Sequence, residues 1–276
     1  MRRSHNADDV AAAAAWVLTQ TKIRPRLGII LGSGLGAFAN TIEGAQRLPY
    51  KSIPLFPEVH VQGHAGDLVL GELDGVPLAI MSGRVHHYEG HDLAHVTLPV
   101  RVLGALGVKK LIVTNAAGGL NPHYAAGTLM VIEDHINLTG SNPLRGPCGP
   151  NDGPRFVDMT HAYSLEGRSA WYEASRGLGL PLRAGVYVGV SGPSYETPAE
   201  VRMMQRLGGD AVGMSTVSEV LTARQIGLEV AGLSVICNAG AGLMPGGLSH
   251  SDVTHVATQM RTSVCQLLSA MVATWS

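Results

Sequence analysis

The chain has 276 residues, of which 45% are hydrophobic and 15% charged, and its formal net charge is −1. This composition is typical of a globular protein with a sizeable core, and it argues against a basic nucleic-acid surface. No apolar run reaches the roughly 18 residues of a membrane helix. Three scattered cysteines, Cys148, Cys237 and Cys265, favour reduced thiols over a disulfide framework or zinc site. We therefore expect a cytoplasmic protein without nucleic-acid or membrane partners.

Apolar periodicity predicts strands that alternate with helices. Strands are expected at residues 27–31, 67–81 (two strands around an Asp74-Gly75 turn), 110–114, 128–133, 185–190, 211–214 and 229–237. Helices are expected at residues 8–20, 93–106, 165–178, 197–206 and 252–271, with another beginning at Ser215-Thr216. No linker or repeat interrupts this alternation. The prediction is therefore an α/β fold, a single domain over residues 1–276 with a twisted, mostly parallel mixed central sheet flanked by helices.

A glycine-rich loop, Gly32-Ser33-Gly34-Leu35-Gly36, follows the first predicted strand. Backbone N–H groups of such a loop form an anion-binding concavity, and the Ser33 hydroxyl adds a donor, so one interpretation is a phosphate cradle. The other interpretation is a plain strand-to-helix turn. The glycine spacing does not match the dinucleotide fingerprint, and no Gly-Lys-Ser/Thr follows as in a P-loop. Other stretches must therefore identify the anion.

Polar residues stand at the carboxyl ends of other predicted strands, where open α/β sheets bind their ligands. They include Asn115, Glu196, Ser215 and Asn238. Glu196 is either an acceptor for a heterocycle N–H or a carboxylate favoured by a helix N-terminus. Asn238 offers a donor and an acceptor to a ligand, or it caps a turn.

The segment Gly83-Arg-Val-His-His-Tyr-Glu-Gly90 is rich in cationic and aromatic residues. Arg84 would clamp a phosphate with its planar fork or form a surface ion pair. The histidines that suggest a metal site are His86, His87, His91 and His95. Because Gly90 interrupts this run and no cysteine or carboxylate pattern completes it, we expect no metal.

His64 and three tyrosines have equally open interpretations. His64 lies in Gly63-His-Ala-Gly66 and either contacts an anion or is a loop histidine without a role. Tyr88, Tyr187 and Tyr195 could pack on a sugar or a base, although a tyrosine in the core or at its rim is the commoner case.

Taken together, the motifs resemble the trimeric, low-molecular-mass class of purine nucleoside phosphorylases, in the nucleoside phosphorylase/methylthioadenosine phosphorylase family. The resemblance covers nearly the whole chain, from Leu27 through the last helix. It rests on residues 31–36 (LGSGLG), 63–66 (GHAG), 83–90 (GRVHHYEG), 114–119 (TNAAGG), 134–137 (DHIN), 192–197 (GPSYET) and 212–216 (VGMST). It implies a phosphorylase/hydrolase-like fold and a glycosyltransferase (pentosyltransferase) of purine salvage. The implied reaction is reversible: a purine (2′-deoxy)ribonucleoside and inorganic phosphate give free base and (deoxy)ribose 1-phosphate, without a cofactor.

The resemblance also implies roles for individual residues. The implied phosphate-binding residues are Ser33, His64, Arg84, His86, Asn115, Ala116 and Ser215. The implied purine-binding residues are Ala116, Tyr195, Glu196, Val212 and Asn238. The implied ribose-binding residues are Tyr88, Tyr187, Met214, His250 and, from a neighbouring subunit, Phe156. Asn238, Glu196 and His86 are the implied catalytic residues, and a homotrimer with shared sites is the implied assembly.

Substrate preference depends on position 238 in this resemblance. Methylthioadenosine phosphorylases carry Asp at this position and favour 6-aminopurines, whereas Asn238 with Glu196 implies 6-oxopurines, namely inosine and guanosine; xanthosine is left open. Cys237 departs from the family, because many members carry Thr before the Asn. A thiol is a weak donor, so we expect a modest effect of Cys237 on base affinity.

Two rival functions remain at this stage. A nucleosidase of the same fold would use water in place of phosphate, although Arg84, His86 and Ser215 argue against it. A nucleoside-binding protein without activity would need at least one catalytic position to be lost, and none is lost in the sequence.

Overall fold

The computed structural model describes residues 7–42, 44–61, 65–150 and 152–276. The helices are α1 (Ala7–Gln20), α2 (Leu93–Ala105), α3 (Leu165–Leu178), α4 (Pro198–Arg206), α5 (Val217–Gln225), α6 (His250–Gln259) and α7 (Arg261–Trp275). The strands are β1 (Leu27–Ile30), β2 (Gln46–Pro49), β3 (Asp67–Leu73), β4 (Val76–Ser82), β5 (Lys110–Gly119), β6 (Leu129–Asn137), β7 (Leu182–Gly189), β8 (Ala211–Gly213) and β9 (Glu229–Ala239). The alternation of strands and helices confirms the predicted α/β fold.

The strands that the structure describes form one mixed sheet in the order β2-β3-β4-β1-β5-β8-β7-β6-β9, and β9 also pairs with β5. The segment β4-β1-β5-β9 is parallel, whereas β2-β3, β3-β4, β5-β8 and β6-β9 are antiparallel. Because β5 pairs with both β8 and β9, the strands β5, β8, β7, β6 and β9 close into a ring. The predicted mixed central sheet is therefore confirmed, and half of it is curled into a barrel.

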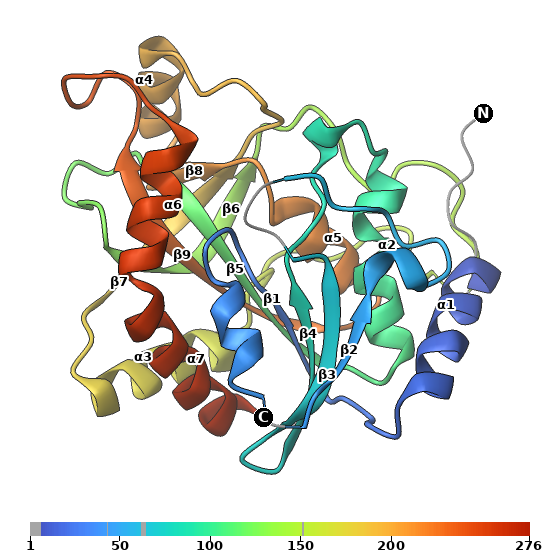
Figure 1. The fold of residues 1–276 in the computed structure, drawn as a ribbon. Helices are drawn as coiled ribbons and strands as arrows, with labels where there is room; N and C mark the ends of the chain where they lie inside the picture. The colour runs from blue at the N-terminus through green and yellow to red at the C-terminus, as the bar shows by residue number, and fades with distance from the viewer. Residues whose placement is uncertain (1–6, 43, 62–64, 151) are drawn as a thin grey trace.

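Two layers of helices cover the sheet (Figure 1). Helices α1, α2 and α5 pack together and bury one core, which includes Val17, Leu98 and Val220. Helices α3, α6 and α7 cover the other core, which includes Trp171 and Leu267. The strands between the layers are buried on both faces, so they appear in the sequence as continuous apolar runs.

Several predicted boundaries are wrong, and one strand was not predicted. The last helix breaks at Met260, because α6 packs on β9 while α7 turns away to pack on α3. Strand β5 continues past Asn115 to Gly119, where its extension pairs with β8 and β9. Strand β2 was not predicted, since it is a short edge strand with three exposed residues and one buried leucine, Leu48.

The glycine loop after β1 lies directly on β5. The Gly32 N–H donates to Thr114 Oγ1 at 3.0 Å. A Cβ at Gly32 would lie 2.7 Å from the Asn115 Cα, a backbone atom that cannot rotate away. Gly32 is therefore required for close approach of two backbones, a use of glycine that the sequence alone does not separate from a turn.

This contact predicts that Gly32→Ala is destabilising. The added methyl group would push the loop away from β5 and should lower the free energy of unfolding by about 1–3 kcal/mol, the usual range for overpacking. The matched control is Gly177→Ala in α3, where an added Cβ meets no atom within 4 Å. The control should leave stability unchanged or raise it by up to about 1 kcal/mol. Urea denaturation of both variants measures the difference, and equal stability of the two would contradict the packing argument.

Candidate active site

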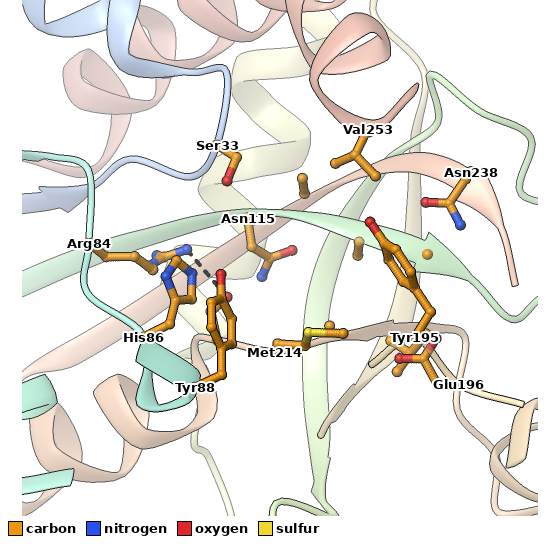
Figure 2. Close-up of a pocket in the computed structure, with 16 residues that line it drawn as sticks. Ser33, Arg84, His86, Tyr88, Asn115, Tyr195, Glu196, Met214, Asn238 and Val253 are labelled. Carbon is orange, nitrogen blue, oxygen red and sulfur yellow. Dashed lines mark hydrogen bonds between the residues drawn. The ribbon is translucent and has the colours of Figure 1, made fainter. Parts of the chain in front are cut away.

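One cavity lies at the carboxyl ends of β1, β4, β5, β8 and β9. The residues that line it are Ser33, Arg84, His86, Tyr88, Asn115, Ala116, Ala117, Gly118, Tyr195, Glu196, Val212, Gly213, Met214, Ser215, Asn238 and Val253. Figure 2 shows Ser33, Arg84 and His86 toward one end, Tyr195, Glu196 and Asn238 toward the other, and Met214 between them. The fold thus gathers most of the residues that the sequence singled out, and it sorts them into two chemically different ends.

Arg84 provides the positive charge of the first end. It follows β4 and is only 2% exposed. Its Nε donates to Glu219 Oε1 at 2.9 Å, and its Nη1 donates to the Thr114 carbonyl at 2.8 Å and to Ser215 Oγ at 3.4 Å. The alternative of a surface ion pair is therefore wrong, since the guanidinium is buried at the cavity wall.

His86 is oriented by a carboxylate three residues later. Its Nδ1 lies 3.3 Å from Glu89 Oε1, the same oxygen accepts from the His86 backbone N–H at 2.6 Å, and Glu89 Oε2 accepts from the His60 N–H at 2.9 Å. Burial alone would raise the Glu89 pKa, but these hydrogen bonds outweigh it and lower the pKa to about 2. The ionised Glu89 therefore favours the His86 tautomer whose Nδ1 carries the proton.

Tyr88 completes this end of the cavity. Its ring stacks on His86 with the centroids 4.7 Å apart and the planes 15° apart. Burial, followed by the nearby Glu89 charge, raises the pKa of Tyr88 to about 12. The phenol therefore stays neutral and acts as an amphipathic wall rather than as a base.

A hydroxyl and amide network forms the floor. Asn115 Nδ2 donates to Thr216 Oγ1 at 2.9 Å, and Thr216 Oγ1 lies 3.1 Å from Ser215 Oγ. Thr216 has a φ of 72°, a strained conformation for a β-branched residue. The buried Asn115 Oδ1 has no hydrogen-bond partner among the described residues, so an acceptor remains at the cavity floor. Backbone strain of this kind concentrates at functional sites.

Glu196 and Asn238 define the second end. Burial, with a smaller contribution from the Glu200 charge, raises the pKa of Glu196. Asn238 ends β9 and donates from Nδ2 to the Ala239 carbonyl at 2.8 Å. Its neighbour on β5 is Gly118, where a Cβ would lie 3.4 Å from Asn238 Nδ2. This end thus presents a carboxylate and an amide, which together offer acceptors and donors to a polar heterocycle.

Two residues named in the sequence analysis, Tyr187 and Phe156, do not line this cavity. Tyr187 is fully buried beneath it, and its hydroxyl lies 3.4 Å from both the N and the O of Ser215, so it supports the floor. Phe156 is 91% exposed on the segment between β6 and α3. His64 lies outside the described residues, and His250 is described only as the first residue of α6.

Cys237 also lies away from the cavity. Its side chain packs in the core beneath α6 and α7, and burial raises the pKa of its thiol to about 12. The register of β5 and β9 passes from Ile236 to Asn238, which leaves Cys237 as the extra residue of a β-bulge. The thiol therefore faces the core and not the cavity, and the modest effect of Cys237 on base affinity stays a prediction.

The histidines that suggested a metal do not form one helical face. His87 belongs to a short 3-10 turn, His91 follows it, and His95 is in the first turn of α2. Within the described residues, no group of three or more His, Cys, Asp or Glu side chains is placed to hold a metal ion.

Sequence reasoning missed residues that support the site. Val253 lines the cavity from α6, and Glu89 and Glu219 hold His86 and Arg84. Thr216-x-x-Glu219 has the spacing of a helix capping box, which suggests a local role for Glu219. However, Thr216 makes no side-chain cap, and Glu219 turns inward to Arg84. Apart from this spacing, nothing in the sequence of α5 marks Glu219 as a buried acid that pairs with Arg84.

Comparison with known proteins assigns this fold and cavity to a class. Residues 26–273 match the family model described as "Phosphorylase superfamily", and the chain belongs to this family. Purine nucleoside phosphorylase 1 of Bacillus subtilis is 49% identical, over 96% of this chain and 98% of that protein. Purine nucleoside phosphorylase of Bos taurus is 44% identical, over 99% and 97%. The chain is accordingly an enzyme with purine nucleoside phosphorylase activity, a transferase of nucleoside metabolism.

Solved structures agree with the sequence relatives. A Schistosoma mansoni purine nucleoside phosphorylase in complex with adenosine has a TM-score of 0.93 and 37% identity, with 98% of each chain covered. A schistosoma purine nucleoside phosphorylase in complex with hypoxanthine has a TM-score of 0.94 and 36% identity, with 100% of each chain covered. The predicted family and fold are confirmed. Among the described helices, none combines the length and apolar character needed to cross a membrane.

The Glu89 contacts predict a pH-dependent contribution to stability. The folded-state pKa of about 2 lies below the ordinary 4.5, so the carboxylate stabilises the fold fully above pH 4.5 and loses this effect as the pH falls toward 2. Glu89→Gln should therefore lower the Tm at pH 7, and this deficit should shrink at pH 3. The control Glu173→Gln removes an exposed carboxylate of α3. A Glu89→Gln deficit that is the same at both pH values would contradict the assignment.

Proposed function

We propose that this enzyme catalyses the reversible phosphorolysis of 6-oxopurine ribonucleosides and 2′-deoxyribonucleosides, namely inosine and guanosine, in cytoplasmic purine salvage. The products are the free base and (deoxy)ribose 1-phosphate. Inorganic phosphate is a co-substrate, and no cofactor or metal takes part. The observation that carries the proposal is the division of one cavity into an arginine end and a carboxylate–amide end.

The arginine end suits a phosphate dianion. Arg84 supplies charge-assisted donors, Ser33 and Ser215 supply hydroxyls, and His86 supplies an imidazole held by Glu89. Asn115 Oδ1 offers an acceptor, which suits the protonated oxygen of hydrogen phosphate. Ser215 and the backbone of Ala116 extend the same wall, and we assign His64 to phosphate on the family resemblance alone.

The other end suits a 6-oxopurine. Glu196 would accept the N1–H and, in guanine, the 2-amino group, while Asn238 would bond the O6 and N7 edge. Tyr195, Val212 and Ala116 line the same end and would contact the faces of the base. Met214 lies between the two ends and Tyr88 stacks on His86 at the arginine end, and both would contact the ribose, together with His250.

The proposed reaction moves electrons from one end of the cavity to the other. A phosphate oxygen forms a bond to the ribose C1′ while the C1′–N9 bond breaks. The electron pair of the broken C1′–N9 bond passes to the purine. The sugar gains oxocarbenium character beside the phosphate, and the leaving base gains negative charge beside Asn238. A hydrogen bond to N7 strengthens as that charge grows, so Asn238 stabilises the transition state more than the substrate.

Substrate turnover tests this proposal. In the presence of inorganic phosphate, inosine and guanosine should react, and kcat/KM for adenosine should be at least about a hundredfold lower, because a 6-amino group leaves the polar contacts of the site unmatched. Adenosine is the sharpest comparison, since a schistosoma relative is solved in complex with it. Asn238→Asp should improve adenosine relative to inosine.

Two results would overturn parts of the proposal. Cleavage of inosine at an equal rate without phosphate would make the enzyme a nucleosidase. Efficient turnover of adenosine by the unchanged protein would remove the 6-oxopurine preference. Xanthosine in the same assay extends the specificity profile.

We further propose a homotrimer in which Phe156 serves the ribose site of a neighbouring subunit. The support is the resemblance together with a large aromatic side chain that is 91% exposed and precedes α3 on a long irregular segment. Sedimentation equilibrium should give three times the mass of 28.9 kDa.

Mixed trimers test whether Phe156 acts between subunits. Phe156→Ala and Asn238→Ala should each be impaired, and subunit exchange between them should restore activity. The restored site combines the intact cavity of one subunit with the Phe156 of the other. Mixing without any gain would show that Phe156 does not act across an interface.

A further inference from the structure

Glu219 is a buried carboxylate that does not line the cavity. It lies on α5, is 3% exposed, and accepts from Arg84 Nε at 2.9 Å. Its other oxygen, Oε2, has no hydrogen-bond partner among the described residues. A buried ionised carboxylate is costly unless it is paired. Among the described residues, the contact with Arg84 is the one hydrogen bond of this carboxylate, and it offsets the cost of burial.

The position of Glu219 complements the other contacts of Arg84. The Thr114 carbonyl and Ser215 Oγ both accept from Nη1, whereas Glu219 accepts from Nε. Because the guanidinium is planar, contacts on two of its nitrogens fix both its position and its plane. Ser215 lines the cavity and Thr114 belongs to β5. Glu219 reaches Arg84 from α5, outside the cavity wall.

The surroundings of Glu219 are packed and aromatic. Its charge contributes to raising the pKa of Tyr50 and Tyr163, in both of which burial is the larger cause. Tyr50 donates to the Gly83 carbonyl at 2.8 Å, next to Arg84 in the chain. A buried tyrosine therefore holds the backbone immediately before Arg84.

We propose that Glu219 is a positioning residue that holds Arg84 in the plane required to bind the phosphate co-substrate. The proposal rests on the proposed function, since it assigns the phosphate to Arg84. Glu219 touches neither phosphate nor nucleoside and acts through Arg84 alone. Its loss therefore affects phosphate more than nucleoside.

Kinetics of Glu219→Ala and Glu219→Gln test this role. Glu219→Ala should raise the KM for phosphate about ten- to a hundredfold, the range expected from loss of a hydrogen bond between charged groups, and leave the KM for inosine within about twofold. Glu219→Gln retains an oxygen that accepts from Nε, so its KM for phosphate should stay within about threefold of the unchanged enzyme. This isosteric variant keeps the test valid if the alanine variant fails to fold.

Two matched variants separate positioning from general stability. Thr222→Val alters a fully buried side chain one turn later on α5, and Glu133→Ala removes a carboxylate on β6 that pairs with Arg168 at 3.9 Å. Both should leave the KM for phosphate unchanged. A lower Tm for Glu219→Ala with an unchanged KM for phosphate would overturn the proposal. A lower KM for phosphate would overturn it too, because the carboxylate would then act mainly by repelling the anion.

Binding of inorganic phosphate alone distinguishes this inference from the proposed function. Phosphate should raise the Tm of the unchanged protein, and Glu219→Ala should reduce that rise. If inosine cleavage does not need phosphate but Glu219→Ala still weakens the phosphate-induced rise, the phosphorolysis proposal fails and the positioning role stands. If cleavage needs phosphate and the rise is the same in both proteins, the positioning role fails.

Discussion

The buried positive charge of Arg84 is the constraint that the rest of the site meets. A charge removed from water loses several kcal/mol unless other groups replace its hydration. The replacements come from two parts of the chain that are distant from Arg84, namely the Thr114 carbonyl on β5 and the Ser215 and Glu219 side chains about a hundred residues later. Without the pairing of β5 with β8, the strand before Ser215 would lie far from β4 in the sheet. Closure of β5, β8, β7, β6 and β9 into a ring brings these groups to one guanidinium.

The same closure explains the strained floor of the cavity. Thr216 keeps a φ of 72° at the junction of β8 and α5, a conformation that costs about 1–3 kcal/mol. Asn115 donates to the hydroxyl of Thr216, and Tyr187 contacts the backbone of Ser215 from below. Gly213 is required beside them, since a Cβ there would collide with the Tyr187 hydroxyl. The strain therefore serves to turn Ser215 toward Arg84 immediately before the helix begins.

The sequence predicts most of this fold because its elements are marked locally. The Asp74-Gly75 turn, the Pro198 start of α4 and the apolar strands all follow from short stretches. The strand ends indicated Ser33, Asn115 and Asn238, which line the cavity. Ring closure is not marked locally, because it depends on pairing between β5 and strands roughly a hundred residues away. The pairing of Glu219 with Arg84 is not marked locally either, and Tyr187, which the resemblance implied as a ribose contact, packs beneath the floor. Binding roles within the cavity stay predictions, since they depend on ligands.

The bulge in β9 shows how one backbone irregularity serves the proposed chemistry. In a regular strand, side chains two residues apart share a face, and Ile236 belongs to a buried core cluster. The extra residue at Cys237 interrupts that alternation, so Asn238 reaches the cavity while the thiol stays in the core. Gly118 on β5 leaves space for the amide. Under the proposed reaction, the leaving base becomes negative at this end, far from the phosphate. A neutral amide can donate to the base as that charge grows, so the bulge and Asn238 together place a donor at the end of the cavity opposite Arg84.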